Sequence, residues 1–192
     1  MNVDKDVTSR LEDGDLIFIR IDNPLYRRVA ATTKSWESHV GILFEDAPGV
    51  WTVAESSVPF STYSPLERFI ARSENGRFAI RRVRGGLSAD EKKRLRDASD
   101  RRMGTLYHLG FKYRSGRLFC SKFVHDVYQE ATGRKVGRLQ TFRELLDANP
   151  DAPLLFWRFW FFGRIPWDRQ TVTTTSQLES EDLVPVYDGK LP

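Results

Sequence analysis

One cysteine, three histidines and a glutamate in a strand-like segment are the residues of this chain whose types could support covalent chemistry. Cys120 opens "CSKFVHDVYQEATG", where apolar residues recur at helical spacing. The unpaired N–H groups and the positive dipole end of a helix N-terminus favour a thiolate, the nucleophilic form of cysteine. A free cysteine is more often a small buried core residue. The thiol is therefore a candidate nucleophile only if a base can reach it.

His39 is the candidate base. It interrupts the apolar segment "SHVGILF", so its imidazole must find a hydrogen-bond partner or face a cleft. If Phe44 faces Val50 across the loop "EDAPG", His39 lies opposite Glu55 in "VWTVAES". A carboxylate in that place could hold the imidazole in one tautomer. A shift of one residue in the register would put the two side chains on opposite faces.

The other two histidines suggest a rival use of the cysteine. His125 follows Cys120 by five residues and points about 140° around the helix from it, which makes it a poor base. A metal site built from Cys120, His125 and His108 has no second cysteine and no paired ligand spacing. The sequence therefore predicts neither a metal site nor a bound cofactor.

The elements that must position these residues are short strands followed by a helix. Strands are predicted at 14–21, 38–44, 50–56 and 78–83, and the second and third form a hairpin. A hydroxyl residue with glutamate three positions later predicts three helix starts, at Ser64, Ser88 and Thr141. The helix of Cys120 ends at Gly133, and "TVTTTSQL" and "LVPVYDG" read as extended chain. This order predicts an α+β domain.

Composition narrows the class of protein. A length of 192 residues, 40% of them hydrophobic, predicts one domain over 1–192 with an aromatic-rich C-terminal extension over about 151–192. A single cysteine excludes an intrachain disulfide. We expect a cytoplasmic protein, because neither a signal-peptide pattern nor a membrane-spanning stretch is seen. Zinc-finger spacing and a continuous basic stripe are both missing, so nucleic acid is not an expected partner.

The segment "LLFWRFWFFGRIPW" (154–167) admits two interpretations. Its aromatic residues could complete the core or wall a substrate groove, which is the favoured reading. Tryptophan and phenylalanine interspersed with arginine also suit contact with a membrane surface or lipid. The sequence does not indicate an oligomeric state.

Five motifs in order give the chain a family likeness. "GDLIF", "SHVGIL", "WTVAES", "GTLYHLGF" and "FCSKFV" together resemble the permuted NlpC-type cysteine hydrolases of the YiiX/YebB-like group, over roughly residues 13 to 130. This group is a branch of the papain-like superfamily and is related to lecithin:retinol acyltransferase-like enzymes. The resemblance implies a circularly permuted papain-like fold, in which an antiparallel sheet packs against the cysteine helix and the histidine strand precedes that helix.

The resemblance also implies roles for individual residues. Cys120 is then the nucleophile, His39 the base and Glu55 the orienting carboxylate. Tyr107 matches the family's tyrosine before the cysteine and is expected near the oxyanion, together with backbone N–H groups around Ser121.

Three positions in or near these motifs depart from the family pattern. Leu106 and His108 replace a proline and an aspartate, which puts substrate preference in doubt, and Lys122 stands where a glutamate is common.

The expected activity is thiol-dependent hydrolysis of an amide or ester bond, with a small peptide-like or acyl substrate. One alternative is a lipid acyltransferase or amidase of the lecithin:retinol acyltransferase-like kind. Another is a binding module that keeps the fold without turnover. A slowly reacting thiol of ordinary pKa would point to the binding module.

Overall fold

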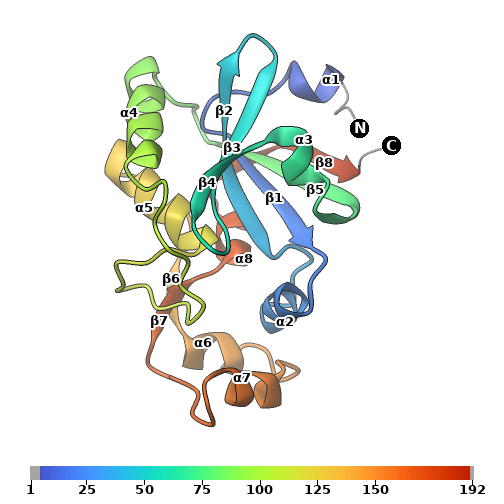
Figure 1. Ribbon diagram of the computed structural model, residues 1–192, viewed down its shortest axis with the longest axis vertical. Helices are drawn as coiled ribbons and strands as arrows, with labels where there is room; N and C mark the ends of the chain where they lie inside the picture. The colour runs from blue at the N-terminus through green and yellow to red at the C-terminus, as the bar shows by residue number, and fades with distance from the viewer. Residues whose placement is uncertain (1–4, 191–192) are drawn as a thin grey trace.

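A six-stranded antiparallel sheet forms the centre of the molecule (Figure 1). The computed structural model describes residues 5–190. Across the sheet the strand order is β4-β3-β2-β1-β5-β8. The strands are β1 (Leu16–Ile21), β2 (His39–Ala47), β3 (Val50–Ser56), β4 (Ser61–Pro65), β5 (Ser73–Val83) and β8 (Leu183–Lys190).

Helices cover the sheet and extend beyond one end of it. The cysteine helix α5 (Cys120–Thr132) packs on β2 and β3 with α4 (Ala89–Asp100) beside it, while α3 (Leu66–Ile70) contacts β3 and β5. A second sheet of β6 (Leu139–Thr141) and β7 (Gln170–Val172) leads away from the main one. The remaining helices are α1 (Lys5–Thr8), α2 (Pro24–Thr32), α6 (Phe142–Asp147), α7 (Leu154–Trp160) and α8 (Thr174–Leu178).

Alternation along β1 explains why its sequence is almost continuously apolar. Leu16 and Phe18 lie in the core cluster that includes the α5 side chains, while Ile17 and Ile19 lie in the cluster on the other side. Since the two faces of the central strands are both covered, residues of both parities are apolar. The α+β class, with an antiparallel sheet against the cysteine helix, is thus confirmed.

The hairpin register differs from the predicted one by two residues. Phe44 pairs with Thr52 rather than with Val50, which pairs with Ala47. The second strand of the hairpin has the predicted bounds, but β2 runs on to Ala47, and a bulge between Glu45 and Ala47 precedes the short turn at Gly49, whose φ is +75°. The predicted five-residue loop is therefore wrong, because β2 continues into it.

Two of the three predicted helix starts are confirmed. Ser88 and Thr141 each cap a helix through a reciprocal hydrogen-bond pair with the glutamate three residues later. The prediction at Ser64 is wrong. Ser64 lies in β4, and α3 begins after Pro65 without a side-chain cap. Residues 61–65 pair with β3 instead, since Thr62 lies across from Glu55.

The C-terminal quarter of the described chain mixes short elements. The segment "TVTTTSQL" is only partly extended, because α8 follows β7 and begins with Thr173 as its cap. By contrast, "LVPVYDG" forms β8 and pairs with β5 at the edge of the main sheet. The predicted extension from about residue 151 thus contributes a strand to the central sheet. Residues 1–4 and 191–192 of the predicted domain lie outside the described residues.

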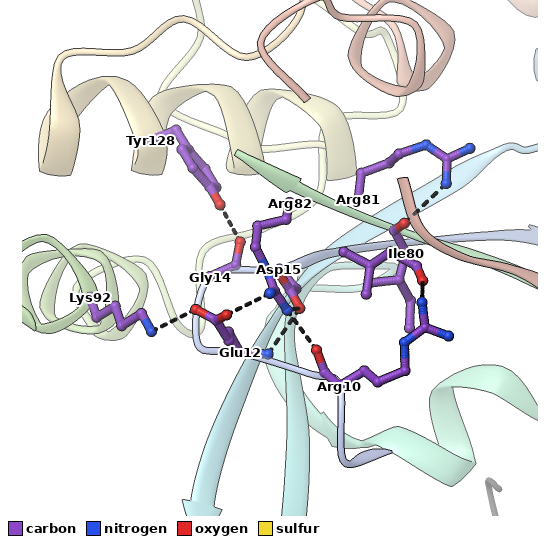
Figure 2. A network of polar contacts seen from close by, with 10 residues as sticks. Arg10, Glu12, Gly14, Asp15, Ile80, Arg81, Arg82, Lys92 and Tyr128 are labelled. Carbon is purple, nitrogen blue, oxygen red and sulfur yellow. Dashed lines mark hydrogen bonds and ion pairs between the residues drawn. The ribbon is translucent and has the colours of Figure 1, made fainter. Parts of the chain in front are cut away.

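A buried ion pair attaches the start of β1 to β5 (Figure 2). Arg82 binds both carboxylate oxygens of Asp15, each at 2.8 Å, and also contacts Glu12 at 2.5 Å. On the helix side, the Tyr128 hydroxyl donates to the carbonyl of Gly14. Asp15 is 1% exposed, so its charge requires this bidentate partner. Within residues 5–190, no helix is long and apolar enough to cross a membrane.

Candidate active site

Cys120 is the first residue of α5. Phe119 before it is extended (φ −135°, ψ 162°) and provides no side-chain cap, so the first N–H groups of the helix have no partner from that side chain. Leu118 is held in place by hydrogen bonds with the backbones of Leu106 and His108. Cys120 itself is 5% exposed. The thiol is therefore placed at the electropositive end of a buried helix.

His39 is the first residue of β2, and its side chain is fully buried. Its Nε2 lies 2.5 Å from Oε2 of Glu55. Nδ1 is also buried and has no hydrogen-bond partner among the described residues, which leaves it available to the thiol. Cys120 is close enough to affect the protonation of the ring. The three side chains that the sequence singled out thus meet in one place.

The protonation of His39 follows from two opposing influences. Burial lowers the pKa of the imidazole, whereas the neighbouring Cys120 and Glu55 raise it. The balance raises the pKa of His39 to about 9. The ring is therefore an imidazolium at neutral pH, beside the Glu55 carboxylate and the side chain of Cys120.

Glu55 is held by more than the histidine. Its Oε1 accepts hydrogen bonds from Ser64 Oγ and from Arg72 Nη2, both at 2.7 Å. Burial raises the pKa of the Glu55 carboxyl, but His39, Arg72 and Ser64 lower it more, to about 2. The guanidinium of Arg72 also lies over the ring of Phe69, 4.8 Å from its centroid. The carboxylate is thus charged and fixed in orientation.

The closeness of His39 and Glu55 was predicted from a register that is wrong. The observed pairing moves Glu55 two residues along β3 from the place opposite His39. Because side chains alternate with a period of two, this shift keeps both on the same face of the sheet. Gly41 lies between them on β2, and a Cβ there would come within 2.3 Å of Val53 Cγ1. The glycine lets the two strands approach closely at this site.

Two tyrosines adjoin the thiol. Tyr107 is buried, and Tyr26 and Cys120 are close enough to its hydroxyl to affect its pKa. Burial raises the pKa of Tyr107, and the neighbouring Cys120 and Tyr26 raise it further, so the phenol keeps its proton. Tyr26 also contacts the ring of His39 edge to face, with centroids 5.9 Å apart. The hydroxyl of Ser121 donates a hydrogen bond to the carbonyl of Val172. The backbone N–H of Ser121, rather than its hydroxyl, is therefore the group that could bind an oxyanion.

Sequence reasoning missed Tyr26, Ser64 and Arg72. Tyr26 comes from α2, which was not predicted although Asn23 caps it and Pro24 is its first residue. That Asn-Pro pair is the signal that could have found the helix. Ser64 was assigned to a helix cap. Arg72 follows α3, and nothing in its local sequence distinguishes it from the other arginines of the chain.

A narrow cavity of about 50 Å³ reaches Cys120. Most of its exposed wall is apolar, although several serine and threonine residues and the tyrosines Tyr26 and Tyr107 also line it. The apolar side chains come from α2, from the segment before α5, from α6 and α7, and from β7. They are Leu25, Val29, Phe111, Phe119, Phe142, Leu145, Trp157 and Val172.

The remaining histidines lie away from this centre. His125 Nδ1 contacts the carbonyl of Val136 at 2.9 Å, and His108 Nδ1 accepts from the backbone N–H of Gly110. Lys122, at a position that departs from the family pattern, forms an ion pair with Asp126 along α5. All three side chains are bound to partners away from Cys120, so none of them is a candidate for the base.

Comparisons with known proteins agree with this architecture. The chain is 33% identical over 143 residues to the uncharacterized protein YiiX of Escherichia coli K12, a match that covers 73% of this chain and 69% of that protein. A crystal structure of metalloprotein YiiX from Escherichia coli O157:H7 superposes with a TM-score of 0.86 at 28% identity. It covers 95% of this chain and 99% of the other.

The O157:H7 protein is named a metalloprotein, and a metal ion needs several donor groups close together. Residues 5–190 hold no group of three or more His, Cys, Asp and Glu side chains arranged to bind an ion. His39 Nε2 and both Glu55 oxygens already have protein partners. A family model of permuted papain-like amidase enzymes matches residues 10–187, and the chain therefore belongs to this YaeF/YiiX family, also designated C92.

Proposed function

We propose that the chain hydrolyses an amide or ester bond of a small peptide-like or acyl substrate, with Cys120 as the nucleophile. The observation that carries the proposal is the buried 2.5 Å contact between His39 and Glu55 beside the only thiol of the chain. A carboxylate–imidazolium pair stabilises a neighbouring thiolate, which is the reactive form. Membership in an amidase family supports the reaction class.

The proposed reaction has two halves. The Cys120 sulfur attacks the carbonyl carbon, and the resulting oxyanion is stabilised by backbone N–H groups at the start of α5 and by the Tyr107 hydroxyl. His39 then gives its proton to the departing amine or alcohol, which leaves a thioester. In the second half, His39 takes a proton from water, and the hydroxide attacks the thioester carbonyl. The bond to sulfur breaks, the carboxylic acid leaves, and the thiolate–imidazolium pair of Cys120 and His39 is restored.

Acyl transfer is a second candidate, favoured by the apolar wall of the cavity at Cys120. An acceptor alcohol or amine would then replace water in the second half of the reaction. Product analysis with and without such an acceptor distinguishes transfer from hydrolysis.

The test uses the fact that the chain has one cysteine, so a thiol-directed probe reports on Cys120 alone. We expect rapid labelling of the wild type, slow labelling of His39→Ala, and none of Cys120→Ala. His108→Ala is the matched control, since that ring is bound to its own loop. Panels of acyl amides and acyl esters then identify the bond. Full turnover by Cys120→Ala would refute the mechanism, and equal labelling of wild type and His39→Ala without turnover would indicate a binding module.

A further inference from the structure

The segment around α7 has two faces of opposite character. Inward, Trp157 is 2% exposed, and its indole N–H donates to Thr32 Oγ1 at 2.8 Å. Phe161 stacks on it, with ring centroids 5.8 Å apart, and Phe142 contacts it edge to face. These residues explain how α7 is attached to the molecule. The opposite face of the helix takes no part in this packing.

The outward face carries three large apolar side chains in solvent. Leu155 is 82% exposed, Phe159 83% and Phe162 99%. Their spacing of four and then three residues places them on one side of the helix and of the turn that continues it. Phe162 takes a left-handed conformation with φ +54°, and its N–H donates to the carbonyl of Phe159. The turn thus displays the ring rather than folding it inward.

This apolar surface is accompanied by positive charge. Arg158 lies on the same side of α7, next to Phe159 and Phe162, and is exposed, as is Arg164 after the turn. Neither guanidinium forms an ion pair within residues 5–190. From residue 152 to 167 the sequence contains no Asp or Glu. Of the acids that flank this stretch, Asp151 contacts Lys34 and Asp168 contacts Arg143.

We propose that this surface, made of Leu155, Arg158, Phe159, Phe162 and Arg164, docks reversibly on an anionic phospholipid bilayer. Exposed apolar side chains that are contiguous mark an interaction site. Rings that enter the boundary between headgroups and acyl chains, with arginines beside them, match a negatively charged lipid surface. A flat apolar protein surface would account for the phenylalanines but not for two uncompensated arginines.

Docking would also orient the candidate active site. Trp157, on the inward face of the same helix, lines the cavity that reaches Cys120. The helices α6 and α7 form one end of the molecule, opposite the β2–β3 hairpin (Figure 1). The bilayer would therefore lie at the end where the cavity wall is built. The docking itself does not depend on catalysis.

Vesicle co-sedimentation tests the proposal, with vesicles of phosphatidylcholine alone and of phosphatidylcholine mixed with phosphatidylserine. We expect the full chain to bind the mixed vesicles, and Cys120→Ala to bind equally, so that a failure of the hydrolase mechanism would not affect this result. The double variant Phe159→Ser, Phe162→Ser should lose binding by about tenfold or more. Arg158→Gln with Arg164→Gln should weaken binding to the mixed vesicles and reduce its salt dependence.

Val50→Ser serves as the matched control, because Val50 is 55% exposed on the hairpin at the opposite end of the molecule. Circular dichroism of each variant checks the fold. Failure of the wild type to bind mixed vesicles would overturn the proposal, as would equal binding by the phenylalanine variant. If gel filtration showed a dimer that the phenylalanine variant converts to a monomer, a second copy would cover this surface and the proposal would also be wrong.

Discussion

Replacing Glu55 with glutamine tests the electrostatics of the site, because the amide keeps the shape of the side chain and removes its charge. The pKa of the carboxyl is about 2, against an ordinary value of 4.5, even though burial raises it. At about 1.4 kcal/mol for each tenfold change, the gap corresponds to about 3 kcal/mol of stability. Since the pKa is lower in the folded state, this contribution is fully present above pH 4.5 and is lost as the pH falls toward about 2.

Urea unfolding followed by tryptophan fluorescence measures the effect. Near neutral pH, Glu55→Gln should be less stable than the wild type by up to about 3 kcal/mol, and the difference should shrink as the pH falls below 4.5. Glu67→Gln is the control, because Glu67 is exposed on α3. A difference that stays constant from neutral pH into the acid range would refute the reasoning, because it would come from packing rather than charge.

The same variant should lose activity. Without the carboxylate, the pKa of His39 falls, because Glu55 is one of the two neighbours that raise it. The imidazolium is then less populated, and its orientation is less fixed. We expect kcat/KM to fall on the order of 10²- to 10⁴-fold, the range of a general acid–base contribution.

Three further predictions concern the same network. The kcat/KM of the wild type should decline as the pH rises through about 9, where His39 loses the proton it gives to the leaving group; a profile that is flat there would contradict this assignment. Arg72→Met should raise the pKa of the Glu55 carboxyl, because the guanidinium lowers it. On acidification, kcat/KM should then fall at a higher pH than in the wild type, and an unchanged pH would argue against the contact. Gly41→Ala should cost about 1–3 kcal/mol in thermal unfolding, since its Cβ would meet a valine methyl of β3 at 2.3 Å, whereas Gly116→Ala, in open space, should cost little.

The strands and the cysteine helix were predictable because their signals are local. An apolar run of strand length, a helical recurrence after Cys120 and a glycine at position 133 each act within a few residues. The capping boxes at Ser88 and Thr141 are of the same kind. Ser64 shows the limit of such signals. Its sequence satisfies the capping pattern, yet pairing with β3 and a hydrogen bond to a buried carboxylate decide its structure.

The contact between His39 and Glu55 was predictable from the sequence for a different reason. His39 and Glu55 stand out because polar groups of their kind rarely enter buried strands without a partner. The argument requires only that the two side chains lie on the same face of the sheet. A register error of two residues leaves both on that face, so the predicted closeness was still correct. Arg72 carried no comparable signal, because an arginine near a helix end is ordinary until the chain folds it against the carboxylate.

The aromatic segment around α7 shows what composition cannot decide. Trp157 and Phe159 are both large and apolar and are separated by a single residue, yet one is 2% exposed and the other 83%. A helix turns about 200° between them, so the orientation of the helix decides which side chain is buried. That orientation is set by a tertiary contact, the hydrogen bond from the indole N–H to Thr32. The reading in which the aromatic residues wall a cavity therefore holds for the face of Trp157, whereas contact of the opposite face with a lipid surface stays a proposal.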